Sequence, residues 1–395
     1  MNIFMIDAAC NSLPYDHSLC EALVRKGCRV NFFGSMYIHT DWNQPASYNF
    51  RNHFYKVTNW IYKGRPRGFL KQYIKAIEHI LNMVHLLFIV KKVKPDIIHF
   101  QWSQLPFIDR WYLRKLNYFS PVIYTIHNST PLHGEKPKFY FLQKVGSSFL
   151  KYFDYCIVHT NYSKKKTVKT TSLNKDKILV IPHGLLNYNF NESQSYQTVF
   201  KKYNISKREK IILFFGNIDH YKGLDILIRS FSMLSASQLK EIHLLIVGRP
   251  NIPIKPLINL SKSLYIEKKI TWDLRFISEN EIQPIFNSCY LIVMPYRHID
   301  QSGVLMSVIN YGKPIVASRV GGFNEILDDG VHGKLVNPED EKDLAFALSN
   351  LIEDHNLINE MSESVKRLAQ SWPTWDKIAE KTIEAYQFAQ EKKGI

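Results

Sequence analysis

Short apolar runs rich in Ile, Val, Phe and Tyr alternate with segments of helical period through most of the chain. This alternation predicts parallel sheets covered by helices, because strands buried on both faces read as continuous apolar runs. The predicted strands of the first half are Asn2–Asp7, Arg29–Phe33, Ile97–Phe100, Val122–His127 and Tyr155–His159, and those of the second half are Ile211–Phe215, His243–Val247, Leu291–Pro295 and Pro314–Ser318. We therefore expect an α/β protein with two doubly wound domains.

The predicted domain boundary follows a further strand, Ile178–Gly184, which ends in Pro-His-Gly. The polar stretch Asn187–Ser195 comes next and is the best candidate for a linker. We accordingly expect a first domain over residues 1–184 and a second over residues 185–371, with residues 372–395 as a separate C-terminal segment.

One predicted helix in the first half is amphipathic, because apolar residues recur in it at spacings of three and four. These residues are Leu70, Tyr73, Ile74, Ile77, Ile80, Leu81, Val84 and Leu87. Basic residues lie in and just before the helix, interleaved with aromatic ones; the basic set is Arg51, Lys56, Lys63, Arg65, Arg67, Lys71 and Lys75, and the aromatic set is Phe54, Tyr55, Trp60, Tyr62 and Phe69. Two interpretations fit: a core-packed helix with a solvated basic segment before it, or a surface that rests on anionic lipid headgroups.

The net positive charge of the chain also lies in its first half. The 395 residues contain 51 Lys and Arg against 35 Asp and Glu, and the whole excess of +16 falls within residues 1–190. The remaining residues are neutral overall. A negatively charged partner, either a membrane surface or a polyanion, is therefore expected for the first half only.

Export and membrane spanning are not expected. The N-terminus has no basic region ahead of an apolar stretch, so it predicts a buried strand and not a signal peptide. The longest apolar run, Ile80–Val90, is interrupted by Asn82 and His85 and falls short of the roughly 20 residues of a membrane span. Five cysteines without a CxxC pair fit a reducing cytosol and argue against a structural zinc site.

Candidate ligand-binding residues follow the strands of the second half, since ligands of open α/β sheets bind beyond the carboxyl ends of the strands. The loop Gly216–Gly223 places a glycine at a strand end and Lys222 beside a helix start, a combination that suits an anion. An ordinary loop is the alternative. After the strand Leu291–Pro295, Ser302 and Gly303 are predicted at a helix N-cap, and a Gly-Gly-x-x-Glu segment ends at Glu325.

Taken together, these segments resemble the retaining GT-B-fold glycosyltransferases of the large bacterial group that builds polysaccharides and glycolipids, known as family 4 or glycosyl transferases group 1. The resemblance rests on residues 214–231, 244–248, 296–305 and 311–333, with weaker signals at 94–102, 125–128 and 181–184. It implies two Rossmann-like domains facing a cleft, with a nucleotide-sugar donor bound by the second and an acceptor by the first. It also implies that residues 372–395 form a helix crossing back to the first domain.

The resemblance implies roles for individual residues. Lys222 matches the lysine that neutralises the donor diphosphate, Glu325 the acidic residue of the Gly-Gly-x-x-Glu segment, and His127 a histidine that faces the transferred sugar. Retention in this family is ascribed to front-face attack, with the leaving phosphate accepting the proton of the acceptor. Each residue also has a structural alternative: His127 as a buried histidine, Glu325 as a helix cap, and Arg297 and Asp300 as a surface ion pair.

Three departures from the family pattern affect the expected donor site. Asn217 replaces the usual arginine of the first phosphate loop, which leaves Arg297 or Arg249 as candidates to supply the cation. The usual pair of glutamates is absent, so that Asp300 is the nearest carboxylate for the donor sugar and Ser307 a weaker partner for the ribose. The third departure is the absence of a Gly-rich loop after the first strand, where residues 8–11 read Ala-Ala-Cys-Asn.

The sequence thus predicts a retaining hexosyl- or glycosyltransferase that extends a lipid-linked or polysaccharide-precursor saccharide, as in lipopolysaccharide or exopolysaccharide biosynthesis, on the cytoplasmic face of the membrane. The absence of Asp-x-Asp predicts that no metal cofactor is needed. The alternatives are an enzyme of the same fold with a soluble acceptor, such as a sugar-phosphate glycosyltransferase or a nucleotide-sugar epimerase, and a nucleic-acid-binding protein, which no recognisable motif supports. Predicted catalytic residues are His127, Lys222 and Asp300; predicted donor-binding residues are Gly216, Asn217, Lys222, Arg249, Arg297, Ser302, Gly303, Ser307 and Glu325.

Overall fold

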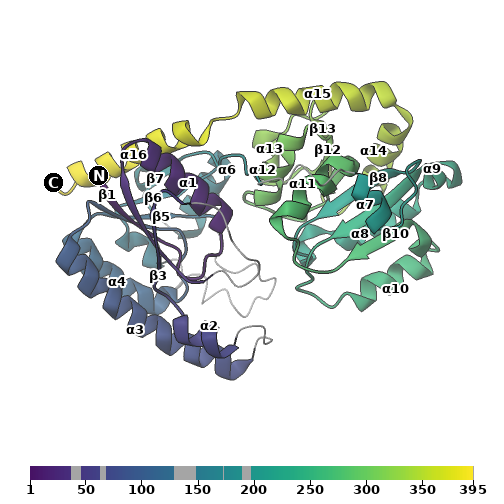
Figure 1. Ribbon diagram of the computed structural model, residues 1–395. Helices are drawn as coiled ribbons and strands as arrows, with labels where there is room; N and C mark the ends of the chain where they lie inside the picture. Colours follow the sequence, from purple (N-terminus) through teal and green to yellow (C-terminus); the bar gives the residue numbers. More distant parts are fainter. Residues whose placement is uncertain (37–45, 63–67, 129–147, 172, 189–196, 395) are drawn as a thin grey trace. The chain divides into compact units, whose positions relative to one another are not determined.

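The computed structural model describes residues 1–36, 46–62, 68–128, 148–171, 173–188 and 197–394. The chain forms two compact units, which are described separately (Figure 1). The first unit combines Met1–Gly184 with Pro373–Ile395, and the second is Leu185–Trp372.

The first unit is built on a seven-stranded parallel sheet in the order β3-β2-β1-β4-β5-β6-β7. Its strands are β1 (Asn2–Ile6), β2 (Arg29–Gly34), β3 (Asn49–Asn52), β4 (Ile97–Phe100), β5 (Val122–Thr125), β6 (Tyr155–Val158) and β7 (Ile178–Val180). Because all of them are parallel, their carboxyl ends lie at one edge of the sheet, here called the first carboxyl edge.

Helices cover both faces of this sheet (Figure 1). They are α1 (Leu13–Arg25), α2 (Lys56–Tyr62), α3 (Phe69–Val93), α4 (Pro106–Phe119), α6 (Asn161–Thr171) and α16 (Trp375–Glu391), with short 3-10 turns η2 (Ser148–Tyr152) and η3 (Lys175–Lys177). Strand β1 shows the two-sided burial: Phe4 and Ile6 pack in the core cluster that contains α3 and α4, whereas Ile3 and Met5 pack with α1 and α16.

The second unit is built on a six-stranded parallel sheet in the order β10-β9-β8-β11-β12-β13. Its strands are β8 (Lys210–Phe215), β9 (Ile242–Val247), β10 (Ile270–Asp273), β11 (Cys289–Met294), β12 (Ile315–Ser318) and β13 (Gly333–Val336). Its helices are α7 (Gln197–Lys202), α8 (Leu224–Ser232), α9 (Ala236–Glu241), α10 (Lys255–Ser263), α11 (Glu279–Ser288), α12 (Gly303–Val308), α13 (Phe323–Ile326), α14 (Glu341–Glu353) and α15 (His355–Ser371), with 3-10 turns η4 (His220–Lys222), η5 (Glu267–Lys269) and η6 (Ile309–Tyr311).

Two doubly wound parallel sheets confirm the predicted α/β class and fit the GT-B fold. All the strands expected from the apolar runs are present, although β5 and β7 end earlier than predicted because their last residues leave the sheet for loops. The strands β3, β10 and β13 were not predicted. They are short, and all four residues of β3 are at least partly exposed, so no apolar run marks them.

Helix α3 contains the amphipathic segment for which the sequence leaves two interpretations open. None of the eight residues of the predicted apolar face is fully buried. Ile80 and Leu87 pack partly against the core, and the fully buried apolar residues of the helix are Met83, Leu86 and Val90. Residues Leu70–Val93 are long and apolar enough to cross a membrane by length and composition, a test that core helices also pass. The sequence analysis considered only the longest apolar run, Ile80–Val90, and therefore did not identify this longer segment. The predicted basic residues Lys63, Arg65 and Arg67 lie outside the described residues.

Candidate active site

The carboxyl ends of β8 and β11 adjoin each other at the centre of the second sheet, and their loops meet there. A Cβ atom added to Gly216, at the end of β8, would lie 2.8 Å from Nζ of Lys222 and 3.0 Å from Cγ2 of Val304 in α12. Gly216 has φ +102°, a conformation that side chains rarely adopt. The lysine ammonium group therefore lies over bare backbone, where a Cβ at residue 216 would crowd it.

Lys222 is buried, with 5% of its surface exposed. Burial lowers the pKa of its ammonium group to about 8, and the charge of Asp219 opposes this shift only in part. Its Nζ atom lies 5.5 Å from the centre of the Tyr296 ring. A buried cation on a ring face has little reason to be there unless it binds an anion, because burial of a charge without a full counterion is costly.

Two other glycines of these loops are required because another segment of backbone packs closely against them. A Cβ at Gly223 would lie 2.0 Å from the carbonyl oxygen of Pro295, and one at Gly248 would lie 2.0 Å from the carbonyl oxygen of Gly216. Both residues have positive φ. These glycines let the loops after β8, β9 and β11 approach closely, so they shape the site without themselves indicating a ligand.

Arg297 joins two of these loops. Its guanidinium group forms a bidentate pair with Asp225 at 2.8 and 3.0 Å, and it also bonds Glu339 and the carbonyl oxygen of His220. A surface ion pair between Arg297 and Asp300 was the structural alternative. The carboxylates that pair with Arg297 are instead those of Asp225 and Glu339. A role for Arg297 at the donor phosphate would require it to leave these partners. Arg249, the other predicted cation, is half-buried just after β9.

Asp300, Gln301 and Ser302 form a buried polar run in the loop after β11, each at most 9% exposed. Loop residues of this kind are usually solvated, so their burial indicates a built surface. The amide nitrogen of Gln301 has no hydrogen-bond partner within the part of the chain that the structure describes. The sequence analysis did not select Gln301; a buried donor without an acceptor is visible only in three dimensions.

The remaining predicted donor residues lie along the same edge. Ser302 caps α12, with its hydroxyl accepting from the Leu305 amide at 3.3 Å, and Gly303 faces open space. Ser307 is buried and bonds Tyr188 at 3.0 Å. Asn217 and Glu325 are exposed, in the loop after β8 and in α13 after β12. The roles of these residues at the donor stay predictions.

His127 lies at the carboxyl end of β5 in the first unit. Its Nε2 atom is 3.0 Å from Oε1 of Gln101, and its Nδ1 atom is 3.3 Å from Nε2 of His159. Trp102 stacks on the imidazole with ring centres 5.1 Å apart, and Tyr15 packs edge-on against it. The histidine is only partly exposed, and both of its ring nitrogens have partners, so its role stays a prediction.

Several imidazoles gather around His127, and all have depressed pKa values. Burial, together with the neighbouring His159, His183 and His99, lowers the pKa of His127 well below its usual range. Burial lowers the pKa of His159 to about 4. These rings are therefore neutral at physiological pH and act as hydrogen-bonding groups. Among the described residues, no three His, Cys, Asp or Glu side chains are arranged as a metal site.

The loop after β1, which lacks the family's glycines, is closed by carboxylates. Asp7 accepts the amides of Ala9 and Ser12, and the Ser12 hydroxyl bonds Asp16. Ser12 also accepts from Nε1 of Trp102 at 2.9 Å, which fixes the indole that stacks on His127. Burial and the neighbouring Asp7 raise the pKa of Asp16 well above its usual range, so this pair retains a proton to higher pH than an isolated carboxylate.

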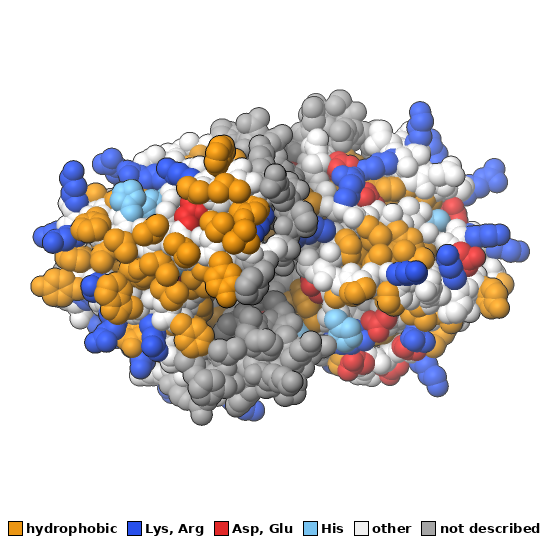
Figure 2. All heavy atoms as spheres, turned by 90° about the horizontal axis from the view of Figure 1, so that it is seen from below, with side chains coloured by type: hydrophobic (Ala, Val, Ile, Leu, Met, Phe, Trp, Pro, Cys, Tyr) orange, Lys and Arg blue, Asp and Glu red, His pale blue; other side chains and the backbone are white. Residues whose placement is uncertain are grey.

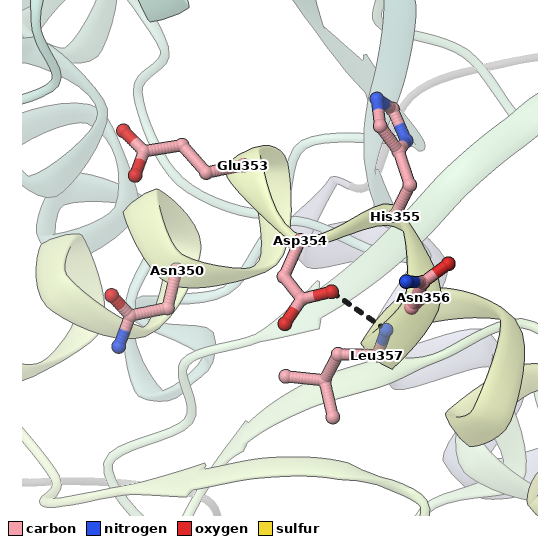
Figure 3. Close-up of a pocket in the computed structure, with 6 residues that line it drawn as sticks. All are labelled: Asn350, Glu353, Asp354, His355, Asn356 and Leu357. Carbon is pink, nitrogen blue, oxygen red and sulfur yellow. Dashed lines mark hydrogen bonds between the residues drawn. The ribbon is translucent and has the colours of Figure 1, made fainter.

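A pocket of the second unit, about 720 Å³, lies away from these residues (Figure 3). It is lined by the junction of α14 and α15, where Asp354 caps α15 through the Leu357 amide at 2.9 Å. Lys210 at the start of β8 bonds His355 and the carbonyl oxygen of Ile352 there. The pocket therefore adjoins the amino ends of the strands, opposite to the edge where ligands of such sheets bind.

Comparison with known proteins places both units in one group. Residues 209–354 match the family described as Glycosyl transferases group 1, and residues 15–185 match Glycosyltransferase Family 4. A solved structure of HepE from Anabaena, in complex with UDP and glucose, superposes with a TM-score of 0.72 at 16% identity and covers 98% of this chain and all of that one. At that identity the likeness shows the fold.

The matches to curated relatives cover a smaller part of each chain. An uncharacterized glycosyltransferase of Methanocaldococcus jannaschii is 25% identical over 62% of this chain and 63% of its own. A D-inositol 3-phosphate glycosyltransferase of Corynebacterium diphtheriae is 25% identical over 59% of this chain and 56% of its own. The matches thus span less than two thirds of the relatives' length. With each unit matched by its own family and the fold shared throughout, the chain belongs to the GT-B glycosyltransferases of the group 1 and family 4 type.

Proposed function

We propose that this protein transfers a sugar, with retention, from a nucleotide-sugar donor to a lipid-linked or polysaccharide-precursor saccharide. The observation that carries the proposal is the buried Lys222 ammonium group over the bare backbone of Gly216, at the ligand-binding edge of the second sheet. A lysine in that place supplies the charge that a diphosphate leaving group requires.

The donor is assigned to the second unit on electrostatic grounds. Lys222 neutralises the diphosphate, and the unpaired amide of Gln301 beside Asp300 offers a donor and an acceptor for sugar hydroxyls. A buried donor that stays without an acceptor costs free energy. A sugar that supplies the acceptor is therefore bound in preference to one that does not. The Anabaena neighbour, solved with UDP and glucose, supports a nucleotide sugar as the donor class.

The acceptor is assigned to the first unit. Neutral His127 can accept or donate a hydrogen bond at a sugar hydroxyl, and the indole of Trp102 provides an apolar surface beside it. Such a mixture of an aromatic face and a few placed polar groups is typical of small-molecule sites. In this scheme the leaving phosphate accepts the proton of the acceptor, and Lys222 stabilises the charge that remains on it.

The first test is a panel of nucleotides added to the purified protein, because a ligand that binds the folded state raises its melting temperature. We expect one of UDP, GDP or ADP to stabilise the wild type, and the stabilisation to be lost in Lys222→Ala. Lys313→Ala, at the amino end of β12, is the matched control. Stabilisation of Lys222→Ala equal to that of the wild type would remove the lysine from the site.

Retention and metal independence are separate parts of the proposal. With an acceptor in hand, the anomeric configuration of the product, read by NMR, decides between retention and inversion. The absence of Asp-x-Asp predicts turnover that survives EDTA. Loss of turnover in EDTA, restored by added Mg²⁺ or Mn²⁺, would contradict this part alone.

A soluble acceptor is the second candidate function, and one finding favours it. The relative from Corynebacterium diphtheriae is a D-inositol 3-phosphate glycosyltransferase, which the name assigns to a small phosphorylated acceptor. Donor hydrolysis and transfer measured with D-inositol 3-phosphate and with lipid-linked saccharides would separate the two. Turnover with the phosphorylated polyol alone would replace the first candidate by the second.

A further inference from the structure

Two polar residues of helix α3, Glu78 and His79, are buried. Glu78, the single carboxylate of the helix, accepts the amides of Val57 and Thr58 at 2.9 and 2.8 Å and so caps α2. His79 lies between the Tyr55 hydroxyl and Asp109 of α4, each at 2.8 Å. The groups that a surface helix normally presents to water are thus used to fix the neighbouring elements.

The opposite side of α3 carries a continuous apolar stripe. Its six residues follow one another at spacings of three and four, so they share one face along most of the helix. They are Leu70, Tyr73, Ile77, Leu81, Val84 and Phe88, each between 36 and 66% exposed. A helix on the surface of a soluble protein usually carries polar residues on its exposed side, whereas α3 carries apolar residues there as well as in the core.

The flanking helices extend this stripe into a surface, which we call the outer face. Helix α2 adds Val57, Trp60 and Ile61, and α4 adds Phe107, Trp111 and Tyr118. Trp60 and Tyr118 are 83 and 85% exposed. Figure 2 shows hydrophobic side chains gathered over one side of the first unit, with Lys and Arg around them. Contiguous exposed apolar area of this kind marks an interaction surface.

The charges of the outer face have one sign. The only carboxylates of α2, α3 and α4 are Glu78 and Asp109, and both are buried. The exposed charged residues of these helices are Lys56, Lys91, Lys92, Arg110, Arg114 and Lys115. A second copy of the chain would bring cations against cations in a two-fold contact, whereas an anionic bilayer complements them.

We propose that the outer face docks the protein in the plane of an anionic lipid bilayer, with the α3 stripe among the headgroups and Trp60, Trp111 and Tyr118 at the interface. Aromatic residues with a polar end favour this depth, and Lys and Arg around an apolar stripe are typical of helices that lie on membranes. The helix does not cross the bilayer, because its other side packs in the core through Met83, Leu86 and Val90.

Docking in this orientation has a consequence for the first carboxyl edge. Helices α2 and α4 both begin at that edge, since they follow β3 and β4. Asp109 of α4 also bonds Ser103, in the loop that carries Trp102. The outer face therefore reaches the edge at which the acceptor is proposed to bind, although docking itself does not depend on the proposed sugar transfer.

The test is flotation of the full-length protein with vesicles, in the absence of donor and acceptor, so that its outcome is independent of activity. The vesicles contain phosphatidylcholine alone or with phosphatidylglycerol as roughly a third of the lipid. We expect binding to the mixed vesicles, and a fall of at least about tenfold in Leu81→Glu/Phe88→Glu, because charges at an inserted face are expelled from the interface. Phe346→Glu, equally exposed on α14 of the second unit, is the matched control and is expected to bind as the wild type does.

The cations are tested separately. Arg114→Glu/Lys115→Glu is expected to weaken binding by about tenfold or more at low salt, since each cation near an anionic surface contributes to binding. Lys268→Glu, on an exposed turn of the second unit, is the control. Circular dichroism and melting temperature establish that each variant is folded. Salt should weaken the binding without abolishing it, because the apolar contribution is not screened.

Three results would overturn the proposal. One is wild-type protein that does not float with the mixed vesicles. Another is a folded Leu81→Glu/Phe88→Glu protein that floats as well as the wild type. The third is a dimer that dissociates in this double variant while vesicle binding is unchanged, which would assign the outer face to a second copy.

Discussion

The carboxyl edges of the two sheets use opposite electrostatics in the same architecture. The edge of the second unit holds a buried cation, Lys222, over a glycine backbone. It also holds the amide of Gln301, for which the described residues supply no hydrogen-bond partner. The edge of the first unit holds neutral imidazoles, among them His127 and His159, and the ring of Trp102. Both edges are built from loops after parallel strands, so the fold alone does not set their chemistry.

The difference teaches where net charge acts. The excess of +16 belongs to the first half of the chain, yet the neutral second half carries the buried cation. A single charge held out of water interacts far more strongly than many solvated ones. The bulk charge of the first unit instead lies on the surface, including the outer face, and suits an extended partner.

Replacement of Lys222 by Ala should have the largest effect. We expect kcat/KM to fall by about a thousandfold, because removal of one preorganised group that stabilises transition-state charge costs that order. Steady-state kinetics of donor turnover provide the measurement, and Lys313→Ala is the control. A fall smaller than tenfold would show that the second edge does not depend on this cation.

Mutation of His127 sharpens the comparison from the other side. His127→Ala should lower kcat by about 10- to 100-fold, the order expected when one buried hydrogen bond to the substrate is lost. The affinity for the nucleotide should stay unchanged, since the residue belongs to the first edge. Calorimetric titration with UDP or GDP checks this; a matching loss of nucleotide affinity would remove the division of labour between the edges. His332→Ala, in the second unit, controls for loss of an imidazole.

The pKa of Lys222, about 8, predicts a pH dependence. Below that pH the lysine is charged in the folded protein, so nucleotide affinity should be constant; above it the charge is lost and affinity should fall. The stability of the free protein should move the other way. Because the lysine of the unfolded chain keeps its proton up to about pH 10.4, the unfolded state binds more protons between the two values, and the free energy of unfolding rises with pH there.

Binding isotherms and urea unfolding measured between pH 6.5 and 9.5 check both directions. Lys222→Ala should show neither trend. Nucleotide affinity that stays level in the wild type through pH 9.5 would place the charge on another residue, such as Arg249.

Gln301 provides the smallest expected effect and the finest distinction. Gln301→Leu should raise the KM for the donor by about tenfold, the loss of one or two hydrogen bonds. Its melting temperature should be unchanged or higher, because the variant removes a buried donor that lacks a partner. Lower stability with unchanged KM would mean that the amide serves the fold and not the donor. Gln301→Glu, of nearly the same shape, replaces the amide donor by a carboxylate and is expected to raise the KM for the donor at least as much.

Much of this structure could be predicted from the sequence, because buried parallel strands are written as uninterrupted apolar runs. The runs located β1, β8 and β11, and with them the loops that hold Lys222 and Ser302. Gly216 could also be selected, since a glycine at the end of a strand lets a ligand approach the backbone, although the same pattern also occurs at glycines required for packing, such as Gly248.

The rest depends on contacts between distant segments. Nothing near Arg297 in sequence reveals that Asp225 and Glu339 occupy its guanidinium group. The link from Trp102 through Ser12 to Asp16 likewise joins residues about ninety positions apart. The outward direction of the α3 stripe was inaccessible for another reason: helical period defines an apolar face, but both sides of α3 are apolar, and only the inward bonds of Glu78 and His79 decide which one packs.

Helix α16 has a consequence for synthesis of the chain. It packs in the core of the first unit, where the Tyr386 hydroxyl bonds His99 at 2.7 Å and the Trp375 ring lies against Gly184. The first unit needs α16, which follows the second unit in the sequence. Its core therefore cannot close while the ribosome is still translating the second unit. The second unit, contiguous in sequence, is therefore the first that can finish folding, and the first unit remains without its last helix until residues 375–391 have left the exit tunnel.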